Sequence, residues 1–293
     1  MKKICLLFLL LAACSEQKSL VTEVAGEAVI YGEDTRKEVS SGDRYYALAA
    51  ATASLVQDYN LKVDASGKFR FPVRTLKNSF PLCKNEPFLD QPLVGFCTGV
   101  LIAPNRVLTA GHCLPHEGGC EHIRFHFGWT AEQAAKSNSL DTLYSCTAVI
   151  QTENNLRKGF DYAILQLDRD VAGVAPVKVS TDKISTHDAV LSLSYPLGLP
   201  LKADLGKVSN ESSFGGFKVE VDTFSGSSGS PLFNKNGELI GILSSGAEDI
   251  LEDDIYRIQK EGGCLNFNRC NDGTCFGETF TKTSLIPDLK QNK

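Results

Sequence analysis

Short segments in which hydrophobic and polar residues alternate run through much of this chain. Strict alternation covers residues 68–73 (KFRFPV), 123–127 (IRFHF) and 218–222 (KVEVD). A period of two is typical of strands that bury one face. A hairpin is predicted over residues 232–243 (LFNKNGELIGIL), because an Asn-Gly pair suits the two central positions of a type I′ turn. Many short strands with frequent turns predict an all-β sandwich or barrel.

One stretch departs from this pattern. Residues 45–58 (YYALAAATASLVQD) are rich in alanine, which has the highest helix propensity. We therefore predict one small helix near the N-terminus.

Length and charge narrow the class of protein. The chain has 293 residues and a formal net charge of −5, and its lysines and arginines form no block. It is long enough to bury a sizeable core in one or two domains. Because a basic patch is missing from the sequence, we expect no nucleic-acid partner.

The first residues have the form of a secretory signal. Lys2 and Lys3 precede an apolar run over residues 4–11, which is too short to span a bilayer as a helix. The run ends in LAAC at residues 11–14, which resembles the bacterial lipobox. An ordinary signal peptide is the alternative.

The lipobox resemblance implies that residues 1–13 are removed and that Cys14 is acylated. The protein would then be exported and anchored in the bilayer through Cys14. Ser15 differs from the Asp associated with inner-membrane retention, so a host with an outer membrane would carry the protein there. Residues 14–28 are small and polar, and we interpret them as a tether or a short pro-segment.

Cysteine usage agrees with export. Without Cys5 and Cys14, eight cysteines remain, and an even number in an exported chain predicts disulfides. A zinc site is an alternative interpretation, because two cysteines and three histidines lie close together in the sequence: Cys113, His116, Cys120, His122 and His126. Their spacing matches no standard finger, and oxidation would consume the thiolates, so we expect no metal.

Three segments carry residues typical of a hydrolytic site. They are residues 97–113 (CTGVLIAPNRVLTAGHC), 161–167 (DYAILQL) and 226–231 (GSSGSP). Together they resemble the signatures of chymotrypsin-like serine peptidases, in the chain order His, Asp, Ser of that fold. The resemblance implies two six-stranded antiparallel β-barrels with the active site between them, and a peptidase domain over residues 29–293.

The resemblance assigns catalytic roles to His112, Asp161 and Ser228. A serine hydroxyl is a poor nucleophile at neutral pH, so a neutral imidazole must take its proton. Asp161 opens an apolar strand, where its carboxylate would fix the tautomer of His112. The amides of Gly226 and Ser228 would stabilise the oxyanion. We expect a monomeric serine endopeptidase without a cofactor, which cleaves protein or peptide substrates through an acyl-enzyme.

The start of the mature chain resembles the V8-type glutamyl endopeptidase branch of this family. Residues 29–36 (VIYGEDTR) match its V-I-x-x-x-D-x-R pattern. The resemblance covers about residues 29–40 and 93–246. The alanine-rich stretch and residues 60–92 would be an insertion, and residues 247–293 form a cysteine-containing tail without a match.

The same resemblance implies a disulfide between Cys97 and Cys113, which bracket the histidine loop. For the other cysteines we expect Cys120 to pair with Cys146, and Cys83 to pair with a cysteine of the tail.

The predicted substrate pocket comprises Asp222, Thr223, Leu243 and Ser244. V8-type enzymes bind a substrate glutamate through a histidine at the position of Leu243, and an aliphatic side chain cannot replace it. Asp222 lies six residues before Ser228, where trypsin-type enzymes place the acid that binds arginine or lysine. The alternative is a solvated strand aspartate.

Two competing functions stay open. The chain could be a non-catalytic serine-protease homologue that acts as a surface binding module, or an esterase, since the same triad cleaves esters. Cleavage before Val29 would create a new amine. Trypsin-type enzymes bind such an amine with an Asp at the position of Ser227, so here we expect the amine to affect substrate binding instead.

Overall fold

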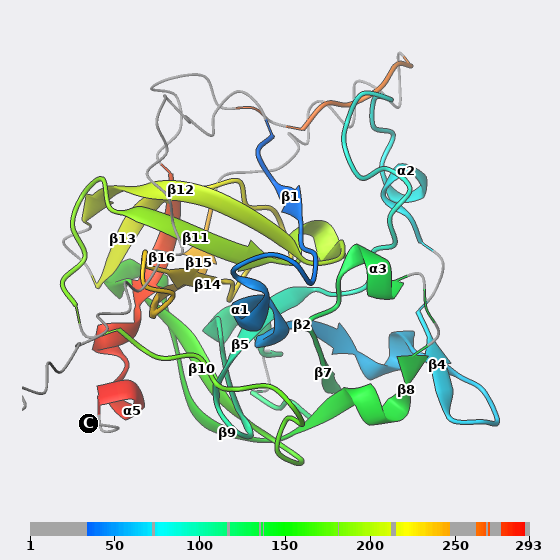
Figure 1. The fold of residues 1–293 in the computed structure, drawn as a ribbon, viewed down its shortest axis with the longest axis horizontal. Helices are drawn as coiled ribbons and strands as arrows, with labels where there is room; N and C mark the ends of the chain where they lie inside the picture. Colours follow the sequence, from blue (N-terminus) through cyan, green and yellow to red (C-terminus); the bar gives the residue numbers. More distant parts are fainter. Residues whose placement is uncertain are drawn as a thin grey trace, which may run out of the picture.

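Two β-barrels form the body of the molecule. The computed structural model describes residues 34–71, 74–115, 118–134, 136, 138–180, 182–211, 215–246, 262–267, 269 and 277–290. The first barrel closes in the order β10-β6-β5-β2-β7-β9. Its strands are β2 (Thr52–Gln57), β5 (Cys97–Ala103), β6 (Arg106–Thr109), β7 (Ile123–Phe127), β9 (Leu143–Asn155) and β10 (Phe160–Leu167). Figure 1 shows it below the second barrel.

The second barrel has the order β12-β11-β14-β15-β16-β13, and the pairing of β12 with β13 closes it. Its strands are β11 (Ala189–Ser194), β12 (Lys202–Glu211), β13 (Gly216–Glu220), β14 (Pro231–Phe233), β15 (Leu239–Ser245) and β16 (Glu278–Lys282). A short β1 (Lys37–Glu38) pairs with the first two residues of β12, Lys202 and Ala203. All these pairings are antiparallel, so the predicted fold class is confirmed.

The remaining elements are short and lie around the barrels. A small sheet joins β3 (Lys62–Val63), β4 (Lys68–Arg70) and β8 (Asn138–Ser139). The helices are α1 (Tyr46–Ala50), α2 (Leu76–Ser79), α3 (Ala131–Ala134) and α5 (Pro287–Lys290). The 3₁₀ turns are η1 (Asp58–Asn60), η2 (Gly111–Cys113), η3 (Leu140–Thr142), η4 (Leu156–Lys158), η5 (Pro196–Gly198) and η6 (Thr283–Leu285). Among the described residues, no helix has the length and apolar character needed to cross a membrane.

The predicted helix over residues 45–58 is only partly present. The helix α1 ends at Ala50, and residues 52–57 form β2, a strand of the first barrel that lies between β5 and β7. Ala53 and Leu55 are completely buried in this strand. Helix propensity is a weak preference that burial in a sheet overrides, so this stretch is part of the barrel and is not an insertion.

The predicted hairpin is present, with a different turn. β14 and β15 pair, with Phe233 opposite Leu239. Of the turn residues 234–237, Gly237 alone has a positive φ, of 75°. A type I′ turn needs two such residues, so that part of the prediction was wrong. The amide of Asn234 donates to the carbonyl of Glu238, which is typical of a three-residue hairpin loop closed by a glycine.

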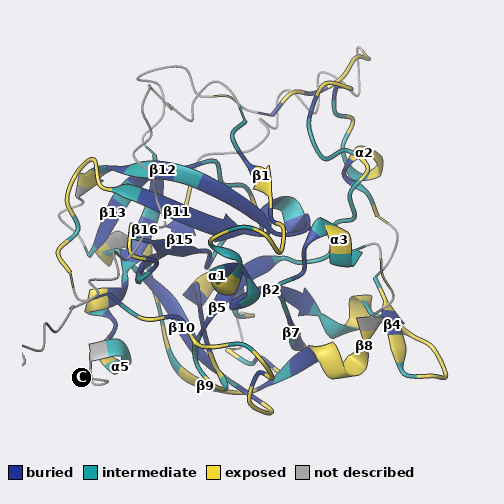
Figure 2. Ribbon diagram, in the orientation of Figure 1, coloured by how far each residue is buried: buried dark blue, intermediate teal, exposed yellow. Residues whose placement is uncertain are grey.

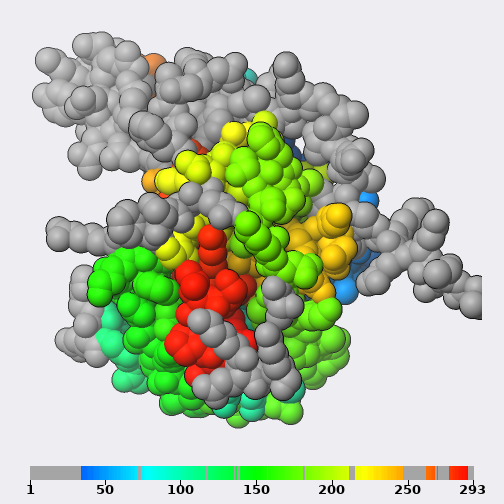
Figure 3. Space-filling model, turned by 90° about the vertical axis from the view of Figure 1, so that its left-hand side faces the viewer, coloured from blue at the N-terminus to red at the C-terminus, as the bar shows by residue number. Residues whose placement is uncertain are grey.

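Buried side chains connect the two barrels. Figure 2 shows the barrel strands mostly buried and the β3–β4 hairpin and connecting loops exposed. Tyr195, completely buried, donates its hydroxyl to the carbonyl of Thr52 and accepts from the amide of Trp129. The C-terminal segment packs Ile286 into the core that includes the first barrel. Figure 3 shows this segment as a red band running from the second barrel onto the first.

Candidate active site

A continuous chain of hydrogen bonds joins Asp161, His112 and Ser228. The Nδ1 atom of His112 lies 2.6 Å from Oδ2 of Asp161, and its Nε2 atom lies 2.8 Å from Oγ of Ser228. The carboxylate of Asp161 is completely buried, whereas the side chain of His112 is 35% exposed. A carboxylate at Nδ1 favours a proton there, which leaves Nε2 able to accept the serine proton. The structure therefore brings the three predicted residues together.

Local backbone structure sets this geometry. His112 lies in η2, directly after β6, and β6 pairs with β10, which carries Asp161. The amide of His112 donates to Oδ1 of Asp161 at 2.9 Å, so the carboxylate holds both the ring and the backbone of the histidine. Gly111 makes this approach possible, because a Cβ atom there would lie 2.4 Å from the carbonyl of Glu153 and 3.0 Å from Asp161.

A disulfide closes the histidine loop. Cys97 in β5 is bonded to Cys113 in η2, across a sequence separation of 16 residues. A loop of this length contributes about 3 kcal/mol to stability in the chain-entropy model. The sulfur atoms also lie near the ring of His112, but cysteines in a disulfide offer no thiolate to a metal ion.

Two further disulfides agree with the predicted pairs. Cys120 is bonded to Cys146, and Cys83 is bonded to Cys264 of the tail. Cys270 and Cys275 lie outside the described residues, as do the predicted signal, the lipobox cysteine and Val29.

The loop before Ser228 presents two amides to the site. The carbonyl of Ser225 accepts from the amide of Leu197, so the next amide, on Gly226, points the opposite way across the trans peptide. Gly226 has a φ of +88°, and a Cβ atom there would lie 3.0 Å from the carbonyl of Tyr195. Among the described residues, the amides of Gly226 and Ser228 donate to no protein acceptor. They can therefore donate to a substrate oxygen.

Thr98 holds this loop in place, and the sequence analysis did not identify it. It is completely buried in β5, and its Oγ1 donates to the carbonyl of Gly226 at 3.0 Å and accepts from the amide of Tyr195 at 3.2 Å. Its own amide donates to the carbonyl of Ser228 at 2.8 Å. Its only sequence signal was its position next to Cys97, because its partners lie about 100 or more residues away.

Asp222 is half-buried, forms a pair with the buried carboxyl of Asp204, and is not a solvated strand residue. Its Oδ2 accepts from the amide of Thr35 at 2.9 Å, and its amide donates to Oδ2 of Asp204 at 2.6 Å. Thr35 also donates its hydroxyl to Asp204 at 2.7 Å. Burial raises the pKa of both carboxyls, and the charge of Asp204 raises the pKa of Asp222 further. The pair therefore keeps a proton at pH values where an exposed aspartate has lost it.

The other predicted pocket residues have distinct surroundings. Thr223 donates its hydroxyl to Oε2 of Glu278 at 2.5 Å. Leu243 packs with the apolar core of the second barrel, and Ser244 donates its hydroxyl to the carbonyl of Thr279 at 2.9 Å. Glu278 was missed because it begins a strand of the tail, beyond the segment for which the sequence offered a resemblance.

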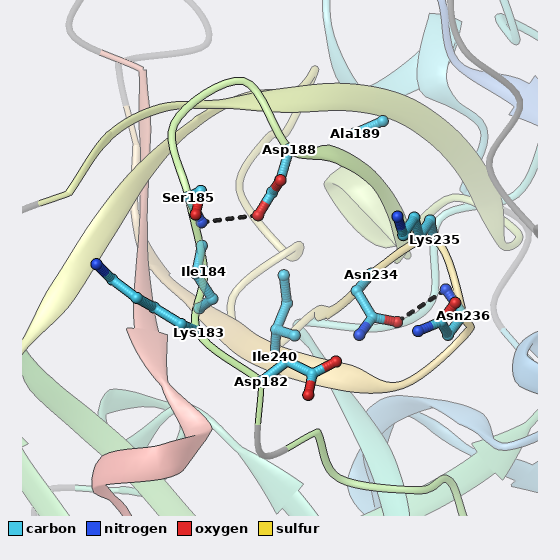
Figure 4. A pocket seen from close by; sticks show the side chains of 10 residues that line it. All are labelled: Asp182, Lys183, Ile184, Ser185, Asp188, Ala189, Asn234, Lys235, Asn236 and Ile240. Carbon is cyan, nitrogen blue, oxygen red and sulfur yellow. Dashed lines mark hydrogen bonds between the residues drawn. The ribbon is translucent and has the colours of Figure 1, made fainter.

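A separate surface hollow contains none of the predicted site residues. It lies between residues 182–189 and the β14–β15 hairpin, with Ile240 at its base (Figure 4). The Ser185 amide donates to Asp188, and the Asn236 amide donates to Asn234, so hydrogen bonds within its walls use several of its polar groups.

Known proteins share both sequence and fold with this chain. It is 26% identical to exfoliative toxin A of Staphylococcus aureus over 243 aligned residues. The alignment covers 78% of this chain and 80% of the toxin. The structure of a Glu endopeptidase matches with a TM-score of 0.54 and 18% identity, over 89% of this chain and 98% of that one. Human heparin binding protein matches with a TM-score of 0.54 and 13% identity, over 87% and 93%.

The two structural matches establish the chymotrypsin-like fold of this chain. The Glu endopeptidase and the heparin binding protein both have this fold. The sequence model of the trypsin-like peptidase domain matches residues 97–242. That span includes Asp161, His112 and Ser228, the three residues of the hydrogen-bonded chain. This chain is therefore similar to trypsin-like peptidase domains over residues 97–242, the part that carries all three residues of the hydrogen-bonded chain.

Proposed function

We propose that this protein is a serine endopeptidase that hydrolyses peptide bonds through an acyl-enzyme. The observation that carries the proposal is the hydrogen-bonded chain from buried Asp161 through His112 to Ser228, at 2.6 and 2.8 Å. A charged carboxylate behind the ring strengthens the imidazole as a base. The two amides of Gly226 and Ser228 supply the second requirement, donors for the oxyanion.

Each residue then has one task in the reaction. Oγ of Ser228 attacks the carbonyl carbon of the scissile bond while Nε2 of His112 takes the hydroxyl proton. The negative charge that develops on the carbonyl oxygen is stabilised by the amides of Gly226 and Ser228. The imidazolium of His112 donates its proton to the leaving amine, and Asp161 stabilises the imidazolium. A water molecule, deprotonated by His112, then attacks the carbonyl carbon of the resulting ester. The bond between that carbon and Oγ breaks, and His112 returns the proton to Ser228.

The test uses a fluorophosphonate probe together with a peptide panel. The protein should react covalently with the probe at Ser228 and cleave internal bonds of peptides. It should also hydrolyse esters of the same acyl group, because they form the same acyl-enzyme and have a better leaving group. Ser228→Ala should abolish labelling and lower turnover by a factor of about a million, and His112→Ala should cost a similar amount. The double variant should be hardly slower than either, because the residues act as a unit.

Two results would contradict this function. A properly folded protein that does not react with the probe and cleaves no peptide would be a binding module. The human heparin binding protein, whose name describes a binding role, has a similar fold. Cleavage of esters alone would indicate an esterase.

We also propose that the protein is exported and held at a bacterial membrane by acylated Cys14. The LAAC sequence at residues 11–14, after a short apolar run, supports this. Several acyl chains on one residue are sufficient for stable anchoring. Cys14→Ser should leave unprocessed precursor in the cell. Processing of that variant, with the same membrane fractionation as the parent, would contradict the anchor.

A further inference from the structure

The carboxylate of Glu278 lies between two segments that flank the nucleophile. Glu278 is the first residue of β16 and is 6% exposed. Its Oε2 accepts the hydroxyl proton of Thr223 at 2.5 Å. On the other side is Gly246, where a Cβ atom would lie 1.8 Å from the same oxygen. Only a glycine at position 246 leaves room for this carboxylate.

These two segments form the walls of the predicted substrate pocket. Thr223 lies five residues before Ser228 in the same loop, and Gly246 follows directly after β15. The amide of Gly229 donates to the carbonyl of Leu243, and the amide of Leu243 donates to the carbonyl of Ser230. These bonds hold β15 beside the residues that follow Ser228. A carboxylate that touches both walls therefore lies where the side chain on the acyl side of the scissile bond, the P1 residue, would bind.

The other acidic candidate for this pocket has different partners. Asp222 directs Oδ2 at the amide of Thr35 and shares a site with Asp204, where the pair retains a proton. Leu243 packs into the barrel core and offers no charge. A carboxylate in the pocket would repel a P1 glutamate, so the substrate implied by the name of the structurally similar Glu endopeptidase does not suit this site.

We infer that Glu278 is the residue that determines specificity, and that it selects substrates with arginine or lysine at P1. A guanidinium or ammonium group in the pocket would form charge-assisted hydrogen bonds with this carboxylate. In a buried site such a pair is stronger than at the surface. The inference concerns the substrate class of the peptidase proposed above and rests on that activity for its kinetic part.

The kinetic test compares Glu278→Gln with the parent on peptides that differ only at P1. The parent should prefer arginine and lysine. Glu278→Gln should lower kcat/KM on these two by about 100-fold, because loss of one partner of a buried charge pair is costly, and should leave peptides with a neutral P1 nearly unchanged. Glu238→Gln is the matched control, since it removes the same charge from the hairpin between β14 and β15. Asp222→Asn should keep the preference for a basic P1.

A binding measurement separates this inference from the proposed activity. Benzamidine, a small aromatic cation, should bind to the Ser228→Ala variant, and addition of Glu278→Gln should weaken its binding about 100-fold. This result would support the cation pocket even in a protein without catalysis. Failure of the parent to bind benzamidine, or an unchanged P1 preference in Glu278→Gln, would overturn the inference. If the parent protein binds benzamidine but is not labelled by the fluorophosphonate probe, the proposed activity alone would be overturned.

Discussion

The hydroxyl of Thr98 donates to the carbonyl of Gly226 at 3.0 Å, and together with the bond from its amide to the carbonyl of Ser228 it links the first barrel to the oxyanion loop of the second. The bond fixes the direction of a loop in which the amides of Gly226 and Ser228 have no protein acceptor among the described residues. Thr98 is thus a positioning residue, because it acts through the backbone and touches no substrate.

Thr98→Val removes this bond and keeps the shape of the side chain. We expect kcat to fall about 10- to 100-fold with little change in KM, since a misplaced oxyanion donor affects the transition state more than the bound substrate. Steady-state kinetics on one peptide would measure the split. Thr98→Ser, which keeps the hydroxyl, should retain most of the activity. An increase in KM alone would assign Thr98 to substrate binding.

The carboxyl pair of Asp204 and Asp222 predicts a fall in stability as the pH rises. Burial raises the pKa of both groups in the folded protein above the usual value of about 3.9 in the unfolded chain. Between these values the folded state holds more protons, so the free energy of unfolding decreases with rising pH from about 4 towards neutrality. Asp222→Asn should flatten this dependence, because it removes one of the two titrating groups. The fold should survive, because the amide oxygen still accepts the hydrogen bond from Thr35. Urea unfolding at several pH values would measure it, and an unchanged slope would contradict the prediction.

His126 predicts the opposite trend in acid. It is 3% exposed and packs against Phe69, Phe71 and Trp129, and burial lowers its pKa to about 4. The unfolded chain binds a proton at about pH 6.5, so the free energy of unfolding should fall by about 3 kcal/mol between pH 6.5 and 4. His126→Phe should lose that part of the acid sensitivity in thermal unfolding experiments. A variant as sensitive to acid as the parent would show that other groups are responsible.

Processing at Val29 should change substrate binding more than turnover. Ser227 is completely buried, and its hydroxyl oxygen accepts a hydrogen bond from the amide of Phe224. A serine at this position offers no carboxylate that could form an ion pair with a new N-terminal amine. Thr35 contacts Asp222, directly before the pocket residue Thr223, so the described chain at Thr35 lies beside the predicted pocket. We expect a protein that starts at Val29 to differ in KM from one that retains residues 15–28, with similar kcat. Equal values of both constants would mean that the amine has no role.

The sequence allowed prediction of residues whose role is local in the chain. His112 and Ser228 each stand in a short motif, and the disulfide of Cys97 and Cys113 brackets one of these motifs. β7 coincides with a predicted alternating segment, since its burial follows from local periodicity.

Features that depend on distant partners were not predictable in this way. Thr98 matters because of its contacts with Gly226 and Tyr195, and Glu278 because of Thr223 and Gly246. A helix was predicted over strand β2 because the alanine-rich stretch that contains it has a high helix propensity. Its burial between β5 and β7 depends on strands that are distant in the sequence.

The disulfide between Cys83 and Cys264 spans 181 residues, and most strands of both barrels lie inside the loop that it closes. A peptide bond cut anywhere within that loop leaves the two fragments covalently joined. A cut in residues 247–261 would therefore not release β16, which carries Glu278 and follows Cys264 in the chain. A peptidase in an environment of other peptidases, or of its own copies, can thus be nicked in this region and keep the strand that forms one side of its pocket. Reduction removes that tolerance.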